Sequence, residues 1–260
     1  MRKNNLSTWL GALLGTVLAL LFSAYAHAQE FTEEFHHSYP LAANGSVDIS
    51  NLNGTVRITG SDTNQVKVDA IKRADSKQKL DDAQIEVESS PNDFELRTRY
   101  HEHDSWFGEY HNPASVDYTI SVPHNARLHA HVVNSRLEIS GVSGEVRAST
   151  VNGQVTASGL MSSAEVTTVN SRAEATFDQL PASGHVKVSS VNGSAIVVIP
   201  ANANAEVRAH SVNGSIHSDF NLQVEHPRYG PGSRVEGRLG SGGAEINLET
   251  VNGGIQIRQR

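Results

Sequence analysis

Residues 142–168 read VSGEVRAST, VNGQVTASG and LMSSAEVTT, three nine-residue units that follow one another without a gap. Each unit opens with an apolar residue and a small or turn-forming pair, and then carries two apolar residues separated by one residue. In the second unit these are Val155 and Ala157, whose period of two places both on one face of a strand. The Asn152-Gly153 step before them supplies residue types that tolerate a positive φ. Each unit therefore predicts one short, half-buried strand and one corner.

Two units make a period of eighteen residues, seen in the spacing of Asn134, Asn152 and Asn170. With this Asn as position 0, positions −6, −4, +3 and +5 are almost all apolar in seven such repeats. We expect these four columns to point inward and to form one continuous core. The columns are Val47, Leu128, Val146, Ala164, Val186, Val207 and Ile246 at −6; Ile49, Ala130, Ala148, Val166, Val188, Ala209 and Leu248 at −4; Val56, Leu137, Val155, Ala173, Ala195, Ile216 and Ile255 at +3; and Ile58, Ile139, Ala157, Ala175, Val197, Ser218 and Ile257 at +5.

Two all-β architectures fit these columns. A β-solenoid with coils of roughly eighteen residues stacks equivalent positions about 4.8 Å apart. A chain of Asn-Gly hairpins places Val155 opposite Thr150 and Ala157 opposite Ala148 on one face instead. The constant period favours the solenoid, as does an apolar residue that recurs before the corner Asn, because identical stacked corners require both. We expect this residue to plug the corner; it is Val133, Val151, Val169, Val191, Val212 and Val251.

The first 28 residues have the features of a secretory signal peptide. Arg2 and Lys3 precede an apolar run, and Ala26-His27-Ala28 forms an A-x-A cleavage site. The run is shorter than a membrane-spanning helix needs, so we expect cleavage and no membrane span afterwards. The chain has no Cys, which excludes disulfides, thiol nucleophiles and lipoprotein acylation. The sequence predicts export to the periplasm, the cell surface or the medium.

The mature chain is acidic. Removing Arg2 and Lys3 leaves 19 basic against 28 acidic residues, a net charge near −9 with His neutral. Nucleic acid and anionic lipid are therefore not expected partners, because both require a basic face. Residues 29–260 are long enough for one domain, and a solenoid core grows with the number of coils.

Three segments depart from the regular pattern of this single domain. Residues 29–40 carry Phe31, Phe35 and Tyr39 and are expected to cap the open end of the stack. From about residue 65 to 122 the alternating runs lengthen, which predicts longer strands in the N-terminal half. Residues 100–113 and the Pro- and Gly-rich residues 220–240 are expected to be inserted loops.

The segment around HEHDSWFGEYHNP (residues 101–113) is the candidate recognition loop. Its aromatic residues are candidates for partner binding, because loops on rigid scaffolds carry binding residues; they are Tyr100, Trp106, Phe107 and Tyr110. His101, His103 and His111, with Asp104 or Glu109, are weaker candidates for a Zn, Cu or Ni site. The alternative is a solvated insertion whose aromatic side chains pack on the flank of the stack.

A polysaccharide lyase or hydrolase site on a β-helix requires clustered carboxylates, usually with Arg or Lys, on one outward face. The outward column at −5 instead alternates in charge or is polar; it reads His129, Arg147, Glu165, Lys187, Arg208 and Asn247. His129 and His131 are expected to point outward, because Leu128 and Ala130 point inward. The outward face therefore has the composition of a solubilising surface, and the sequence indicates no catalytic residue and no cofactor.

Several motifs together resemble the bacterial putative-adhesin β-strand-repeat family of exported domains, whose function is unknown. These motifs are the Asn-Gly-x-Val-x-Ile units, Val122-Pro123, Gly141–Val146 and the closing Glu249–Ile255. The resemblance covers roughly residues 40 to 258. It implies a β-helical exported protein and brings no catalytic residues with it.

These observations predict an exported, non-enzymatic interaction module of the cell envelope or surface that binds a glycan or an envelope protein. A carbohydrate-active enzyme of the β-helix type is the alternative from a different class, and three or more carboxylates within about 10 Å of one another in a groove would favour it. A weak metal-binding envelope protein is the third possibility.

Overall fold

The computed structural model describes residues 30–101, 113–226 and 231–260, and these ranges are almost entirely β-strand. The elements are β1 (Phe31–Pro40), β2 (Ser46–Asn53), β3 (Val56–Ser61), β4 (Gln65–Ala74), α2 (Lys77–Asp82), β5 (Ala83–Ser89), β6 (Asp93–Tyr100), β7 (Ser115–Pro123), β8 (Arg127–Asn134), β9 (Leu137–Ser140), β10 (Val146–Thr150), β11 (Val155–Leu160), β12 (Ala164–Thr168), β13 (Ala173–Phe177), β14 (His185–Asn192), β15 (Ala195–Ile199), β16 (Ala205–Asn213), β17 (Ile216–Ser218), β18 (Val224–Glu225), β19 (Ser233–Leu239), β20 (Ala244–Asn252) and β21 (Ile255–Gln259). The predicted signal peptide lies outside the described residues.

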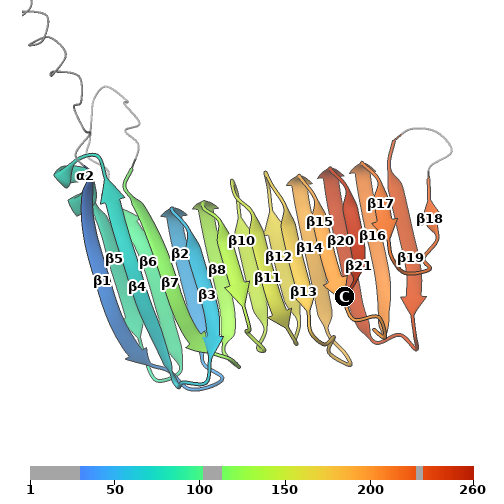
Figure 1. The fold of residues 1–260 in the computed structure, drawn as a ribbon, viewed down its shortest axis with the longest axis horizontal. Helices are drawn as coiled ribbons and strands as arrows, with labels where there is room; N and C mark the ends of the chain where they lie inside the picture. The colour runs from blue at the N-terminus through green and yellow to red at the C-terminus, as the bar shows by residue number, and fades with distance from the viewer. Residues whose placement is uncertain (1–29, 102–112, 227–230) are drawn as a thin grey trace, which may run out of the picture.

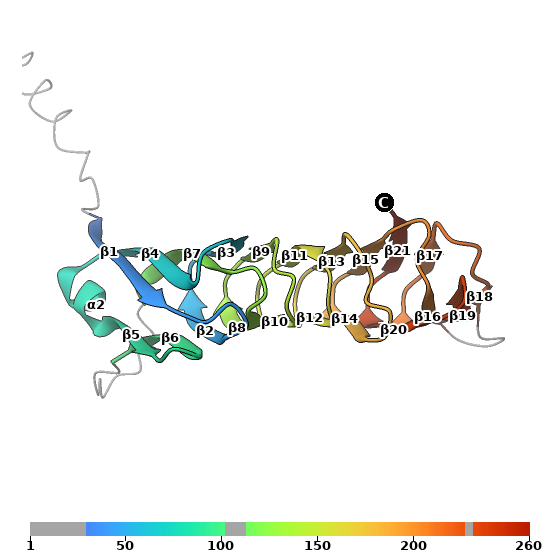
Figure 2. The same ribbon diagram turned by 90° about the horizontal axis from the view of Figure 1, so that it is seen from below.

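The strands form two facing sheets, which are seen face-on in Figure 1 and as two layers in Figure 2. In the described residues the ten-stranded sheet has the order β1-β4-β7-β3-β9-β11-β13-β15-β21-β17, and the eleven-stranded sheet has the order β18-β19-β16-β20-β14-β12-β10-β8-β2-β6-β5. Along the chain, β8 and β9, β10 and β11, and the following pairs alternate between the two sheets. We call such a pair of strands, joined at a corner Asn, a rung.

The four predicted columns are confirmed. Val155 pairs in parallel register with both Leu137 and Ala173, and Val146 pairs with both Leu128 and Ala164. Val146 and Val155 are fully buried between the two sheets. The hairpin alternative is wrong at this point, because β10 and β11 lie in different sheets and each has parallel neighbours one rung away. The period of two selects the buried face within each strand, and the eighteen-residue period aligns neighbouring rungs.

The order of rungs in the stack differs from their order in the chain. The first rung, β2 with β3, lies between β6 with β7 on one side and β8 with β9 on the other. The last rung, β20 with β21, is inserted between β14 with β15 and β16 with β17. Figure 1 shows both insertions, with dark red strands between orange ones at the C-terminal end. The sequence predicts a simple progression instead, because every rung has the same column character and none identifies its neighbour.

A fifth buried column, at position −2, consists largely of hydroxyl side chains. Thr150, Thr168, Ser190, Ser211 and Thr250 are all almost fully buried. Each donates a hydrogen bond to a backbone carbonyl near a corner; Thr168 Oγ1, for example, lies 2.9 Å from the Gly153 oxygen. Because a buried carbonyl without a partner is costly, these hydroxyls stabilise the corners from inside.

The corner glycines also differ from expectation. Of the Asn-Gly glycines in the described chain, Gly54 alone has a positive φ, at 114°. The others are required for a different reason. A Cβ built on Gly153 would lie 1.8 Å from the backbone oxygen of Ser135 in the neighbouring rung. Stacked corners approach so closely that a side chain cannot fit between them.

The N-terminal end is closed by β1, which pairs antiparallel with β4. Phe31, Phe35 and Tyr39 are half-buried and pack against the core. Strands β4 and β7 have ten and nine residues, but β16 and β20 near the other end also have nine, so long strands are not confined to the N-terminal half. Helix α2 follows β4, and the Lys72 ammonium holds it to the sheet by hydrogen bonds to the carbonyls of Leu80 and Ala83.

The C-terminal end contains strands where the sequence predicts a loop. Residues 220–240 include β18 and β19, and β19 pairs antiparallel with β16 along seven residues. Ser233, Val235 and Leu239 point inward and are buried. The sequence shows their period of two. However, the segment contains Pro and Gly residues and its strand runs antiparallel, so it does not follow the nine-residue repeat.

Candidate binding surface

The outer face of the eleven-stranded sheet carries three outward columns, at positions −5, −3 and −1. The stack brings distant segments together here, since Asp48 of β2 pairs in register with both Glu95 of β6 and His129 of β8. Beyond His129 the −5 row continues in register with Arg147 of β10 and Glu165 of β12. The −3 row runs beside it through Arg97, Ser50, His131, Ser149 and Thr167.

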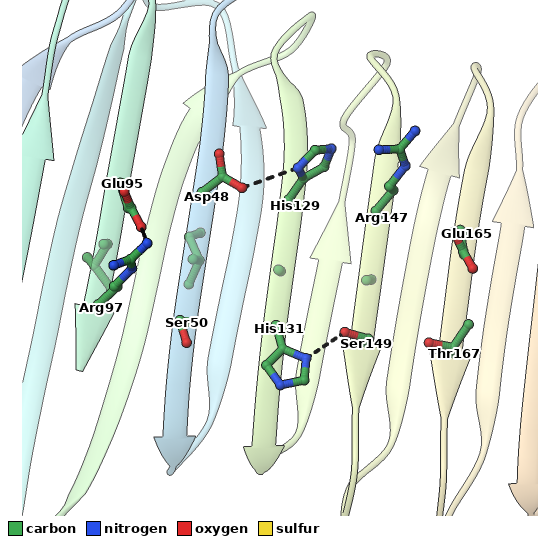
Figure 3. A pocket seen from close by; sticks show the side chains of 14 residues that line it. Asp48, Ser50, Glu95, Arg97, His129, His131, Arg147, Ser149, Glu165 and Thr167 are labelled. Atoms are coloured by element: carbon green, nitrogen blue, oxygen red, sulfur yellow. Dashed lines mark hydrogen bonds and ion pairs between the residues drawn. The ribbon is translucent and has the colours of Figure 1, made fainter. Parts of the chain in front are cut away.

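These two rows border a shallow hollow of about 520 Å³ (Figure 3). Its floor is formed by Ile49, Leu96, Ala130 and Ala148, whose strands run beneath the polar rows. Long side chains dominate the −5 row, whereas Ser50, Ser149 and Thr167 in the −3 row are short. The face is therefore recessed along the short side chains.

The polar groups of the hollow are held by neighbours across the strands. His129 Nδ1 lies 3.2 Å from Asp48 Oδ1, and His131 Nδ1 lies 2.9 Å from Ser149 Oγ. Glu95 and Arg97 form an ion pair, and Lys187 lies 3.5 Å from Glu165. These side chains are partly exposed, so their mutual pairing contributes little to stability and leaves donors and acceptors open to a ligand.

The carboxylates of the hollow are spread along the stack. Asp48 and Glu95 lie on adjacent strands, but Glu165 lies three strands away from Asp48, about 14 Å at the usual strand spacing. The three therefore do not converge on one point. The arrangement offers a row of hydrogen-bonding groups to an elongated polar ligand.

The −1 column lies on the same face, next to the hollow. The structure contradicts the expectation that these valines plug the corners, because Val169, Val191, Val251 and Val212 are 37 to 43% exposed. The strand alternation explains this result. Position −2 points inward and carries the buried hydroxyls, so position −1 must point outward.

The corner Asn side chains form a hydrogen-bonded ladder beside the valines. Asn53, Asn134, Asn152, Asn170, Asn192, Asn252 and Asn213 are linked in this spatial order by six bonds from Nδ2 to Oδ1 of 2.8 to 3.1 Å. All six bonds run in the same direction along the stack. The ladder also confirms the spatial order of the rungs, because Asn252 bonds between Asn192 and Asn213.

The described part of the chain includes two of the predicted site residues. Tyr100 is half-buried against the core, its hydroxyl donates to the Ala114 carbonyl at 3.0 Å, and burial raises its pKa to about 12. His101 is exposed, and its backbone N–H donates to the Asp82 carbonyl. The remaining candidates lie outside the described residues; they are His103, His111, Trp106, Phe107 and Tyr110. Within the described ranges, no group of three or more His, Asp or Glu side chains is placed to hold a metal ion.

His129 and His131 point outward as predicted, but the sequence did not identify the hollow. Its composition depends on Asp48 and His129 lying side by side although 81 residues separate them. The outward rows of β8, β10 and β12 alone give an ordinary polar surface. The addition of β2 and β6 next to β8 completes the hollow.

A separate polar cluster lies on β1 and β4. His36 is exposed, and its ring contacts Asp69 at 2.7 Å and Glu34 at 3.2 Å. These two hydrogen bonds, Asp69 first, raise the pKa of His36 above its ordinary value. The pKa of Asp69 is lowered, mainly by its hydrogen bond with Lys67 and then by that with His36.

The described residues contain no helix with the length and apolar character of a membrane span.

Comparisons with known proteins bear on the fold alone. No family model and no curated protein matches the sequence. A crystal structure described as a putative cell adhesion protein from Clostridium sporogenes matches with a TM-score of 0.53 and 16% identity, over 89% of this chain and 100% of the other. Two structures described as putative adhesins, from Bacteroides fragilis and Parabacteroides merdae, cover 88% and 89% of this chain with TM-scores of 0.39 and 0.30 and identities of 12% and 9%. The first similarity shows that this chain shares the two-sheet fold of the Clostridium protein.

Proposed function

We propose that this chain is an exported β-solenoid that acts as an adhesin-like binding module of the cell envelope or surface. The hollow on the eleven-stranded sheet carries this proposal. It aligns partly exposed carboxylates, imidazoles, two guanidinium groups and hydroxyls in two rows that run along the stack. Such groups suit the hydroxyls of a glycan or the polar backbone of an extended protein segment.

Four further observations support the assignment. Residues 1–28 have the features of a signal peptide, and the net charge of the mature chain, near −9, disfavours nucleic acid. A solved structure with the same fold is described as a putative cell adhesion protein. The spread of Asp48, Glu95 and Glu165 along the stack suits binding better than glycoside cleavage, which requires converging carboxylates.

A glycan array and immobilised envelope proteins, probed with mature protein (residues 29–260), test the proposal. Changing His129 and Arg147 together to Ala removes two side chains of the −5 row and should weaken binding about ten-fold or more, the loss of one or two charge-assisted hydrogen bonds. Glu174→Ala is the matched control, because Glu174 points outward from β13 in the other sheet. Equal binding by the double variant and the control would show that the hollow is not the binding site.

The two alternatives based on the predicted loop keep their own tests. Changing Trp106 and Phe107 to Ala should reduce recovery of envelope partners if the loop contributes to docking. A calorimetric titration with Zn²⁺ tests His101, His103 and His111; heat no greater than that of dilution removes the metal-binding alternative.

A further inference from the structure

We infer that the corner edge of the eleven-stranded sheet binds an uncharged, extended β-linked glycan, which lies along the stack with its sugar rings on the −1 valines. This inference rests on the proposed binding function and names its ligand class. The first observation is the exposure of the valines. Four of the five exposed large apolar residues in the described chain belong to this one column; they are Val169, Val191, Val251 and Val212. They lie on adjacent rungs, so their exposure forms a continuous line.

Polar groups flank the valine line on both sides. In the four rungs that carry the exposed valines, the −3 neighbours are Thr167, Ser189, Glu249 and His210, which pair in register. The other side is the Asn ladder. Each interior amide of the ladder uses one N–H and one lone pair along the stack, which leaves its second N–H and second lone pair to face solvent.

This order of polar, aliphatic and amide groups matches the two sides of a sugar ring. The C–H face of a pyranose packs on methyl groups, and its equatorial hydroxyls point sideways to hydrogen-bonding partners. In an extended β-linked chain, consecutive rings advance by a distance comparable with the strand spacing of about 4.8 Å. Each rung of the line therefore offers a valine and an Asn amide to successive sugars, with a hydroxyl, carboxylate or imidazole group at position −3.

Charge decides in favour of a neutral chain. Positions −1, 0 and +1 carry no charged side chain in any of the seven rungs, although 19% of all residues are charged. A polyanionic glycan would find no cation on this line and would meet the Glu249 carboxylate beside it, and the net charge of the mature chain, near −9, would repel it. A second copy of the protein is a poor occupant, because partly exposed valines offer far less than the roughly 1,200 Å² that a stable protein interface buries.

Calorimetry with cellohexaose, chitohexaose and laminarihexaose, and with the matching disaccharides, tests the inference. At least one hexasaccharide should bind about ten-fold more tightly than its disaccharide, because it contacts more rungs. The double variant Val169→Ser with Val191→Ser should weaken that binding about ten-fold through lost apolar contact. Met161→Ser is the matched control, because Met161 is 45% exposed outside the line, and it should leave the affinity unchanged. Polygalacturonate should not compete.

The outcomes separate this inference from the proposed function. Suppose that the double variant His129→Ala with Arg147→Ala abolishes glycan binding and the valine variant leaves it intact. This result would support the hollow as the binding site and overturn the inference about the valine line. Failure of all three hexasaccharides to bind also overturns it. A wild-type dimer in sedimentation velocity that the valine variant dissociates would show that the line is a self-interface.

Discussion

The corner glycines are the residues on which the close stacking of rungs depends. A Cβ on Gly193 would lie 1.7 Å from the backbone oxygen of Ser171, and one on Gly253 would lie 1.8 Å from that of Gly193. A backbone oxygen in a stacked corner cannot move aside as a flexible side chain can. The glycine in the repeat therefore reports contact between neighbouring rungs, and only at Gly54 does it also supply a positive φ.

Gly153→Ala should lower the free energy of unfolding by about 2 kcal/mol or more, because the new methyl group forces two rungs apart. Urea denaturation followed by circular dichroism measures the change. Gly254→Ala is the matched control in an equivalent corner, where the nearest atom to a built Cβ is 3.5 Å away. The control should stay within about 0.5 kcal/mol of wild type. A similar loss in both variants would contradict the packing explanation.

The residue pattern predicts the burial of apolar positions but not that of the buried hydroxyls, and there is a physical reason for each. Val155 and Ala173 were predictable, because an apolar residue at every second position identifies a buried face wherever the strand lies. The burial of the Thr150 and Thr168 hydroxyls was not predicted, since small polar side chains usually lie outside. Their recurrence two residues before each corner Asn, in phase with the inward columns, is the signal that would have identified them.

At the scale of elements, the N-terminal end shows how a stack of rungs stops. Glu33 of β1 lies on the same side of the strand as Phe31 and Phe35, and its carboxylate lies 2.9 Å from Lys72 Nζ. Lys72 is buried, and its ammonium also lies 3.1 Å from the Ala83 carbonyl and 3.4 Å from that of Leu80. The side chain thus links β1, β4, α2 and β5. A charged group at an edge also disfavours pairing with another chain.

Lys72→Met keeps most of the side-chain volume but leaves the Leu80 and Ala83 carbonyls without this donor. We expect a loss of about 1–3 kcal/mol in the free energy of unfolding, the cost of buried polar groups left unpaired. Lys67→Met is the matched control on the same strand, because Lys67 is exposed and pairs with Asp69; its effect should remain below about 1 kcal/mol. Thermal unfolding compares the midpoint temperatures of both variants. An equal shift in midpoint would show that Lys72 contributes no more to stability than the exposed Lys67.

At the scale of the whole molecule, the chain does not build the stack from one end to the other. It starts with β1 at the outer edge, forms the rung β2–β3, completes the N-terminal end with β4 to β7, and returns to the other side of that first rung with β8. At the far end the last rung enters between two earlier ones. The hollow depends on the first of these insertions, since it places Asp48 beside His129. The column pattern fixes which residues face inward, but it leaves this order open.

The order of rungs predicts that an internal deletion is tolerated better than a C-terminal truncation of similar length. Chain position alone would predict the opposite. Deleting residues 143–160 removes β10 and β11 from the middle of the chain, yet joins Val142 to Met161 with every column still in register, because eighteen residues are lost. Strands β8 and β9 then meet β12 and β13, whose inward residues match. We expect this variant to fold cooperatively with a strand-rich circular dichroism spectrum.

Ending the chain at Leu239 removes about as many residues but takes away β20 and β21, which separate β16 and β17 from β14 and β15. Strand β17 then loses β21, its pairing partner, and β16 retains β19 alone. Because the remaining strands have lost their parallel neighbours, residues 205–239 should lose protection in hydrogen exchange measured by mass spectrometry, while residues 127–177 keep theirs. Two outcomes would show that the inserted last rung does not hold the C-terminal end to the stack. One is that the truncated chain protects residues 205–239 as wild type does. The other is that the internal deletion unfolds the protein.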